Sequence, residues 1–416
     1  MSDEFDDERT ASERAEPVAV GAPRQRMSRL ERIRARRNHT RRRAVAGAAV
    51  ALLLAVVLAV IFLGTKIFHS DSGEYSGAGK DDIVVQVHDG DSTTQIGQTL
   101  RDQDVVANVK SFVDAAKDNA AIAAIQPGFY KMRTEMSASS AVERLADPGT
   151  RVGKLVIPEG RQLDDVKAVG SDKTTDGIFT MIADASCVEL NGQRKCVAAE
   201  DLRKVAEQAD PAALNIPDWA MKPVAALGQN HRRLEGLIAP GAWNVDPSGS
   251  AQQILATLVA QSADHYVKGG LLDTAKAMNM SPYEILVVGS LVQREAKPAD
   301  FAKVARVIYN RLAAPQRLEF DSTVNYPLDR QEVATTDADR AKVTPWNTYA
   351  SDGLPATPIC SPGDEALAAA ERPDPGDWLY FVTVDMDGTT LFTKDYQQHL
   401  ANIELARRNG VLDSAR

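Results

Sequence analysis

A long apolar run near the N-terminus constrains this chain more than any other feature of its sequence. Residues 44–68 contain no charged side chain before Lys66 and are rich in Ala, Val and Leu. At 1.5 Å per residue, about 20 such residues cross the roughly 30 Å hydrocarbon core of a bilayer. A run that is apolar on all sides is typical of a membrane span rather than of a buried core helix, and the leader before it is too long for a cleaved signal peptide. We therefore predict a transmembrane helix over residues 44–68.

Charge on the two sides of this run predicts its orientation. Residues 24–43 carry ten arginines against one acid, whereas the segment that follows the run is acidic. The positive-inside rule places residues 1–43 in the cytoplasm and residues 69–416 outside. Residues 1–43 hold few large apolar side chains, so we expect a disordered cytoplasmic tail. The predicted location is the cell membrane, with a single span, a cytoplasmic N-terminus and an extracytoplasmic C-terminal part.

The remainder of the chain is long enough for two folded units. Residues 69–82 are rich in Gly, Ser and Asp and are expected to form a linker. Residues 83–150 alternate short apolar strands with amphipathic helices, which predicts a small α+β unit. Residues 151–416 predict a larger mixed α+β domain, so the fold class is α+β. The net charge of −9 argues against a nucleic-acid partner.

Two of the three cysteines flank a hairpin signal. Asn191-Gly192 is typical of a two-residue turn, and with that turn Cys187 faces Cys196 in a non-hydrogen-bonded pair. Such pairs have Cα atoms about 4.5 Å apart, a separation that a disulfide can bridge. We predict a disulfide between Cys187 and Cys196, with two buried free thiols as the alternative. Cys360 is expected to be a buried thiol, and no Cys/His set has the spacing of a zinc site.

Residues 281–296 carry the strongest signal for chemistry. Ser281 and Glu284 form a capping box around Pro282, which fixes the register of the predicted helix. In that register Glu295 falls in the last turn, on the apolar stripe formed by Ile285, Val288, Leu291 and Val292. Burial and the negative end of the helix dipole both raise the pKa of a carboxyl group, as a general acid requires. The alternative is a carboxylate that leaves the helix end for solvent, paired with Arg294 or Lys297.

Polar and aromatic side chains follow this helix. Residues 317–326 are predicted to be an extended polar stretch, and Trp346 and Tyr349 are candidates to stack on sugar rings. Asn347 is a candidate to bond hydroxyl or acetamido groups. Each of these residues has packing as its alternative role.

Several motifs in order resemble one known family. They are Arg294-Glu295-Ala296, Val304–Leu312, Arg317–Tyr326, Trp346–Tyr349, Gly353–Ile359, Ser361–Gly363 and Asp377–Val382. With Ile157–Gly160 and Leu234-Glu235-Gly236, this order resembles the endolytic murein transglycosylases, also called MltG or YceG-like proteins, over about residues 81–410. Residues 83–150 resemble the LysM-like subdomain of that family, a glycan-binding type of fold.

The resemblance implies an activity and a site. Members cleave within nascent peptidoglycan strands between N-acetylmuramic acid (MurNAc) and N-acetylglucosamine (GlcNAc), leaving 1,6-anhydro-MurNAc ends that would terminate elongation. The catalytic glutamate falls on Glu295, which serves as acid and then as base, without cofactor or metal. The predicted substrate contacts are Glu235, Asn310, Asp321, Thr323, Trp346, Asn347 and Tyr349. Expected partners are the glycan strands and the cell membrane, with peptidoglycan synthases (penicillin-binding proteins) as candidates.

The chain departs from the family pattern at three places. Gln293-Arg294-Glu295 stands where members often have E-K-E, and Pro240–Trp243 stands where they often have Pro-Asp-Thr-Tyr. Ser322 replaces a usual proline. These differences concern substrate contacts and leave the position of Glu295 unchanged.

Two other functions compete with this interpretation. A muramidase that uses water would need a second carboxyl group, for which Glu235, Glu319 and Asp321 are the candidates. A non-catalytic scaffold would bind glycan through residues 83–150 and recruit wall synthases. The scaffold predicts that Glu295→Gln leaves function in cells intact.

Overall fold

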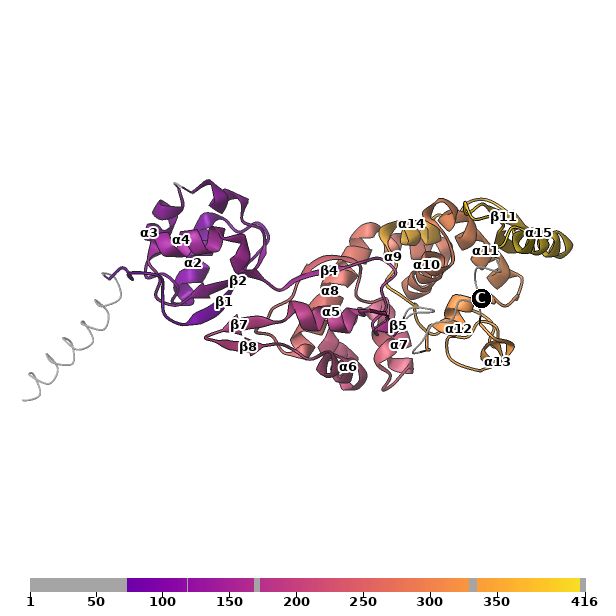
Figure 1. Cartoon of the computed structure of the whole chain (residues 1–416), viewed down its shortest axis with the longest axis horizontal. Coiled ribbons are helices and arrows are strands. Elements are labelled where there is room, and N and C mark those ends of the chain that lie inside the picture. The colour runs from indigo at the N-terminus through magenta and orange to yellow at the C-terminus, as the bar shows by residue number, and fades with distance from the viewer. Residues whose placement is uncertain (1–72, 118, 168–172, 329–334, 412–416) are drawn as a thin grey trace, which may run out of the picture. The chain divides into compact units, whose positions relative to one another are not determined.

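The structure is a computed structural model that describes residues 73–117, 119–167, 173–328 and 335–411 (Figure 1). The predicted tail, the predicted transmembrane helix at 44–68 and the first residues of the predicted linker lie outside this part. Among the described residues, no helix is both long and apolar enough to cross a membrane. The described chain has two separate hydrophobic cores, one in residues 83–146 and one in residues 155–392.

The small unit is built on a three-stranded antiparallel sheet in the order β1-β2-β3. Its elements are β1 (Asp82–Val87), α2 (Thr93–Asp102), α3 (Val109–Ala116), β2 (Gly128–Arg133), α4 (Ala138–Ala146) and β3 (Arg151–Val152). Strand alternation turns Val85 and Met132 inward, onto Leu100 and Phe112 of the helices. Residues 77–81, at the end of the predicted linker, hydrogen-bond to residues 134–137 and so pack on this unit.

The large unit is mainly helical, and its strands pair only two by two. Its strands are β4 (Lys154–Ile157), β5 (Val166–Lys167), β6 (Thr174–Thr175), β7 (Val188–Leu190), β8 (Gln193–Lys195), β9 (Gly241–Asn244), β10 (Tyr380–Thr383) and β11 (Thr390–Thr393). Its helices are α5 (Ile178–Ala185), α6 (Ala199–Gln208), α7 (Asp218–Ala226), α8 (Ala251–Gly269), α9 (Leu271–Met278), α10 (Pro282–Glu295), α11 (Phe301–Ala313), α12 (Asp321–Asn325), α13 (Asp337–Arg340), α14 (Asp364–Glu371) and α15 (Tyr396–Arg408).

Helix α10 lies at the centre of the large unit. It contacts α7, α9, α11, α12 and α14, and every residue from Ile285 to Val292 is buried (Figure 1). The predicted capping box is present, because Ser281 and Glu284 bond to each other's backbone. The predicted helix and its register are therefore confirmed, and the burial of its middle turns anchors the end that carries Glu295.

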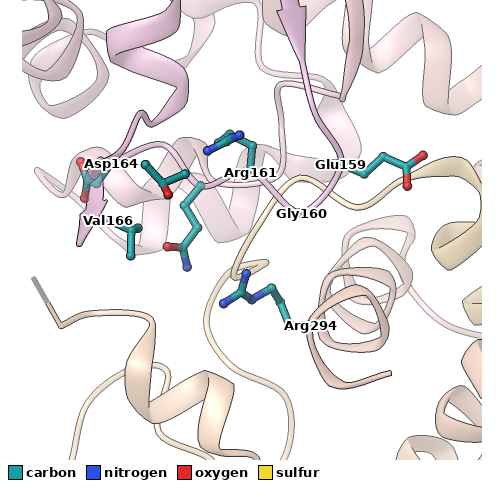
Figure 2. A pocket seen from close by; sticks show the side chains of 8 residues that line it. Glu159, Gly160, Arg161, Asp164, Val166 and Arg294 are labelled. Carbon is teal, nitrogen blue, oxygen red and sulfur yellow. The ribbon is translucent and has the colours of Figure 1, made fainter. Parts of the chain in front are cut away.

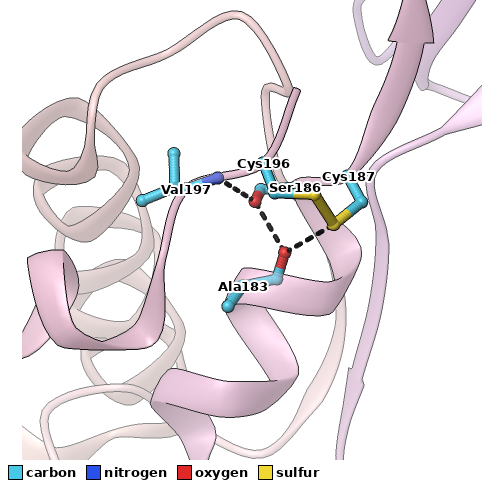
Figure 3. Close-up of a disulfide and its surroundings, with 5 residues drawn as sticks. All are labelled: Ala183, Ser186, Cys187, Cys196 and Val197. Carbon is cyan, nitrogen blue, oxygen red and sulfur yellow. Dashed lines mark hydrogen bonds between the residues drawn. A yellow bond between two sulfur atoms is a disulfide. The ribbon is translucent and has the colours of Figure 1, made fainter. Parts of the chain in front are cut away.

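The predicted disulfide between Cys187 and Cys196 is confirmed (Figure 3). Strands β7 and β8 pair Glu189 with Arg194, as a turn at residues 191–192 requires. The Cα atoms of the two cysteines are 4.2 Å apart. Beside the bridge, the Ser186 hydroxyl donates to the carbonyl of Ala183 and accepts from the Val197 amide. Cys360 is a free and fully buried thiol, as predicted.

The prediction of an extended stretch over residues 317–326 is wrong in its second half, which forms the short helix α12. An extended buried segment needs a neighbouring strand to satisfy its backbone groups, and none pairs with this one among the described strands. A helical turn satisfies them locally instead, since the amides of Thr323 and Tyr326 bond to the carbonyls of Phe320 and Ser322. The turn brings Asp321 and Ser322 to the end of α10.

Candidate active site

Glu295 is the last residue of α10 and is partly buried. It lines a cavity of about 160 Å³, here called the Glu295 cavity. The opposite wall comes from the hairpin β10–β11, which contributes Phe381, Thr383 and Thr390. Lys297 donates to the carbonyl of Asp387 at 3.2 Å, which ties the end of α10 to the turn of that hairpin. Glu295 therefore borders a small space that is lined by two different parts of the fold.

Burial raises the pKa of Glu295 to about 7, and the negative charge of Asp321 acts in the same direction. The hydroxyl and backbone amide of Ser322 lower it, because donors beside a carboxyl group favour its charged form. The Ser322 hydroxyl has no partner of normal hydrogen-bond geometry in the described part, so its influence is that of a long contact. A pKa near neutrality lets one carboxyl group donate a proton and later accept one.

Asp321 lies beside Glu295 and is held by three neighbours. It accepts from Tyr349 Oη at 2.8 Å, from Thr335 Oγ1 at 2.7 Å and from Arg340 at 3.1 Å. The Arg340 guanidinium also stacks over the Tyr349 ring, 4.8 Å from its centroid. Asp321 and Tyr349 thus form one side of the surroundings of Glu295, and Asp321 is fixed in an ion pair.

Glu235 lies in a different place. Its side chain is 1% exposed, and burial raises its pKa to about 8. Oε2 accepts from the Leu163 amide at 3.1 Å and from Tyr326 Oη at 2.8 Å, while Oε1 has no hydrogen-bond partner among the described residues. The following residue, Gly236, has φ of 76°, and a Cβ there would lie 2.5 Å from Pro358, so only glycine allows this turn. Glu235 lines another cavity and not the Glu295 cavity.

Three predicted substrate contacts are buried and bonded within the protein. Asn347 donates to the carbonyls of Asp339, Arg340 and Lys342 and accepts from the Tyr349 amide. Trp346 donates to Thr357 and packs its edge on Tyr326. Thr323 bonds to Phe320 and Thr348. The structure gives these side chains a role in holding the loops that frame the site.

Asn310, the remaining predicted contact, also bonds within the protein. Its amide donates to the carbonyls of Gly376 and Trp378, and it does not line the Glu295 cavity. It secures the segment that leads into β10. The third candidate for a second carboxyl group, Glu319, has a left-handed backbone with φ of 54° and lies 3.9 Å from Arg311.

Sequence reasoning did not single out the hairpin side of the Glu295 cavity. In β10 and β11, Phe381, Thr383 and Thr390 carry no sequence motif that distinguishes them from other strand residues. The hydroxyl oxygens of Thr383 and Thr390 lie 3.3 Å apart across the hairpin. The signal that could have found them is strand alternation, which puts Phe381 and Thr383 on the same face.

Two further cavities open beside this site. The Arg294 cavity, of about 360 Å³, is lined by Arg294 and by Gly160, Arg161, Gln162, Asp164 and Val166. Figure 2 shows Arg294 reaching from the end of α10 toward the segment that carries Arg161 and Asp164. The Glu235 cavity, of about 230 Å³, shares Gln162, Asp164 and Val166 with it and adds Arg203, Arg232 and Glu235. Arg294 also lines the Glu295 cavity, so shared side chains connect all three.

The described residues offer no set of side chains suited to a metal ion. In the part of the chain that the structure describes, His, Cys, Asp and Glu side chains form no group of three that could hold a metal ion.

Comparison with known proteins gives a consistent set of relatives. The sequence matches the YceG-like family over residues 85–405. It is 27% identical over 323 residues to an endolytic murein transglycosylase of Bacillus subtilis (strain 168), covering 77% of this chain and 83% of that protein. It is 24% identical over 335 residues to an endolytic murein transglycosylase of Streptococcus pneumoniae serotype 2, covering 77% of this chain and 58% of that protein.

A solved structure is also similar. A crystal structure of a YceG-like protein of Listeria monocytogenes shares 27% identity with this chain at a TM-score of 0.50. The match covers 77% of this chain and 98% of that one. The similarity thus extends over the described units rather than over one motif.

Proposed function

Because the chain belongs to the YceG-like family, we propose that it is an endolytic lytic transglycosylase with Glu295 as its acid and base. Its substrate is the glycan strand of peptidoglycan, cut between MurNAc and GlcNAc. The observation that carries this proposal is a carboxyl group with a pKa of about 7 in a cavity between α10 and β10–β11. Relatives from two organisms that carry the name endolytic murein transglycosylase support the reaction class.

The chemistry balances without water. Protonated Glu295 gives its proton to the oxygen that links MurNAc C1 to GlcNAc, and this bond breaks to leave a free GlcNAc hydroxyl. The MurNAc C6 hydroxyl oxygen then bonds to C1, and its proton returns to Glu295. The product end is 1,6-anhydro-MurNAc, and the carboxyl group is restored to its starting state. A pKa near neutrality suits both steps, since neither proton transfer is then strongly uphill.

The surroundings of Glu295 favour this route over hydrolysis. A muramidase that uses water needs a second carboxyl group as base or nucleophile. Of the three candidates, Asp321 is the one whose charge raises the pKa of Glu295. Its carboxylate already accepts hydrogen bonds from Tyr349, Thr335 and Arg340. Glu235 lines a different cavity. An intramolecular hydroxyl needs no second carboxylate to activate it.

The remaining parts of the proposal concern location and partners. Residues 44–68 would anchor the protein in the cell membrane with its described units outside, and residues 83–150 would serve as a LysM-like glycan-binding unit. Cleavage of nascent strands would terminate their elongation, so a peptidoglycan synthase is the candidate protein partner. A disulfide at Cys187–Cys196 is in keeping with an oxidising compartment.

The test is product analysis with the full chain in detergent micelles. Isolated glycan strands are incubated with the protein, and the products are identified by mass spectrometry, in which an anhydro end is one water lighter than a reducing end. We expect anhydro ends from the wild type and none from Glu295→Gln. The control is Glu371→Gln, because Glu371 is also buried with a raised pKa but does not line the Glu295 cavity.

Each outcome decides between the functions. Reducing ends would replace the transglycosylase by a muramidase. Equal activity in the wild type and Glu295→Gln would remove Glu295 from the mechanism. Complementation in cells by Glu295→Gln would favour the non-catalytic scaffold.

A further inference from the structure

The proposed reaction uses Glu295 and leaves the Glu235 cavity without a role. Glu235 is almost fully buried and is one of the residues that line this cavity, and its Oε1 atom has no hydrogen-bond partner in the described part. Buried polar atoms in proteins are nearly always hydrogen-bonded. This oxygen therefore marks a position that suits a polar group of a ligand. Its raised pKa makes the carboxyl group neutral near pH 7, so it can donate as well as accept.

The ionic side chains of the cavity compensate one another. Asp164 pairs with Arg203 at 2.8 Å and with Arg232 at 3.0 Å, and Asp165 also lines the space. With Glu235 neutral, two arginines face two aspartates, and His231, which contacts Asp164 at 2.9 Å, completes the ionisable lining, so no large excess of positive charge remains for a phosphate or a polyanion. The composition fits an uncharged ligand with many hydroxyl and amide groups, which is the chemistry of an N-acylated sugar.

Arg232 is held rigidly in this cavity. Its guanidinium lies 5.7 Å from the centroid of the Tyr326 ring and 5.9 Å from that of Trp346, and it pairs with Asp164. Rigid donors lose little entropy when they bind a ligand. The buried position of Trp346, which removes it from direct sugar stacking, thus serves to position Arg232.

The cavity is also a neighbour of the proposed site of cleavage through shared lining residues. Gln162, Asp164 and Val166 line both the Glu235 and the Arg294 cavities, and Arg294 lines both the Arg294 and the Glu295 cavities. Three neighbouring polar cavities suit an extended polymer with repeating units better than a single small molecule.

We propose that the Glu235 cavity is a remote glycan subsite, which binds an N-acylated amino-sugar unit of the strand whose scissile bond lies at Glu295. This inference rests on the proposed function, because it takes the glycan strand as the polymer. Val166 lines both the Glu235 cavity and the Arg294 cavity and is partly exposed, so a larger side chain there would block the path between them.

The test measures binding rather than cleavage. Calorimetry follows the binding of a hexamer of β-1,4-linked GlcNAc to the full chain that carries Glu295→Gln, with and without Val166→Trp. The matched control is Val156→Trp, because Val156 is 65% exposed on β4 and lines none of the three cavities. The small unit is identical in all variants, so any glycan that it holds does not alter the comparison.

We expect Val166→Trp to raise the Kd for the hexamer about tenfold, equivalent to about 1.4 kcal/mol, and Val156→Trp to leave it unchanged. An unchanged Kd in Val166→Trp overturns the subsite. Should that variant fail to fold, Arg203→Gln on the half-exposed face of α6 replaces it, with an expected rise of about threefold, equivalent to about 0.7 kcal/mol; no rise overturns the proposal.

Failure of the proposed function has a different signature. A wild-type chain that releases no anhydro ends refutes the transglycosylase, whatever the hexamer affinities are. Release of anhydro ends with no effect of Val166→Trp on binding refutes only the remote subsite.

Discussion

Replacing Glu295 by Gln should stabilise the large unit at alkaline pH while it abolishes cleavage. The pKa of Glu295 rises from 4.5 to about 7 on folding, chiefly because of burial. The folded chain therefore holds this proton to higher pH than the unfolded chain does. Its contribution to stability is fully present below about pH 4.5 and is lost as the pH rises through about 7. Gln cannot ionise, so the variant escapes this loss.

The magnitude follows from the two pKa values. Each pH unit between them is worth about 1.4 kcal/mol, so the full difference corresponds to about 3 kcal/mol. Part of the Glu295 side chain remains exposed to solvent, and water screens its charge. We therefore expect the variant to be more stable than the wild type by about 1–2 kcal/mol at alkaline pH. In a unit of this size that equals a rise in Tm of a few degrees at pH 8 and none near pH 4.5.

Tryptophan fluorescence is a suitable probe, because all four tryptophans lie in the large unit. Thermal unfolding of the wild type and Glu295→Gln is followed from pH 4.5 to pH 8.5, with Glu365→Gln on the exposed start of α14 as the control for the substitution itself. The gap in Tm should open between about pH 4.5 and pH 7. A gap that is constant with pH, or a variant less stable at pH 8, would refute the buried-acid argument.

Further predictions concern pH, loops and the disulfide. Cleavage should fall about tenfold per pH unit above about pH 7, where Glu295 loses its proton. Ser322→Pro removes the hydroxyl and the backbone amide that lower this pKa, so it should move the alkaline limb of the pH–kcat/KM profile to higher pH. An unmoved limb would contradict the role of these two donors. Asn347→Ala removes a side-chain donor from three backbone carbonyls, of which that of Asp339 keeps the Lys342 amide, and should lower the free energy of unfolding by about 2–3 kcal/mol in urea titrations. Normal stability with a raised KM would instead make Asn347 a substrate ligand. Replacing Cys187 and Cys196 by Ser should lower stability by about 2–3 kcal/mol in the same assay, with cleavage retained below the melting temperature.

Local signals in the sequence were sufficient where they fixed a register. The capping box at Ser281 determined which side of α10 is apolar, and so the position of Glu295 in its last turn. The Asn191-Gly192 turn determined which residues face each other across β7–β8, and so the disulfide. In both cases one short-range constraint and a known period specify the geometry completely.

Sequence patterns did not predict the structure where it depends on contacts between residues that are far apart in the chain. No pattern within residues 317–326 reveals that the segment lacks a strand partner and forms α12. Asn347 has the chemistry of a sugar ligand, but its donors are used by backbone carbonyls of its own loop. The hairpin wall near Phe381 is separated from Glu295 by many residues, and only tertiary packing brings them together.

Gln293, two positions before Glu295, has a structural role that more than one side chain can fulfil. Gln293 Oε1 accepts the amide of Gly363 at 2.8 Å, which secures the loop before α14. A glutamate could supply the same acceptor, so exchange between the two is neutral for the backbone it supports. At position 295 an amide has no proton to cycle. A search for relatives that demanded both acids of the E-K-E pattern would discard this chain, whereas one that required only the second would retain it.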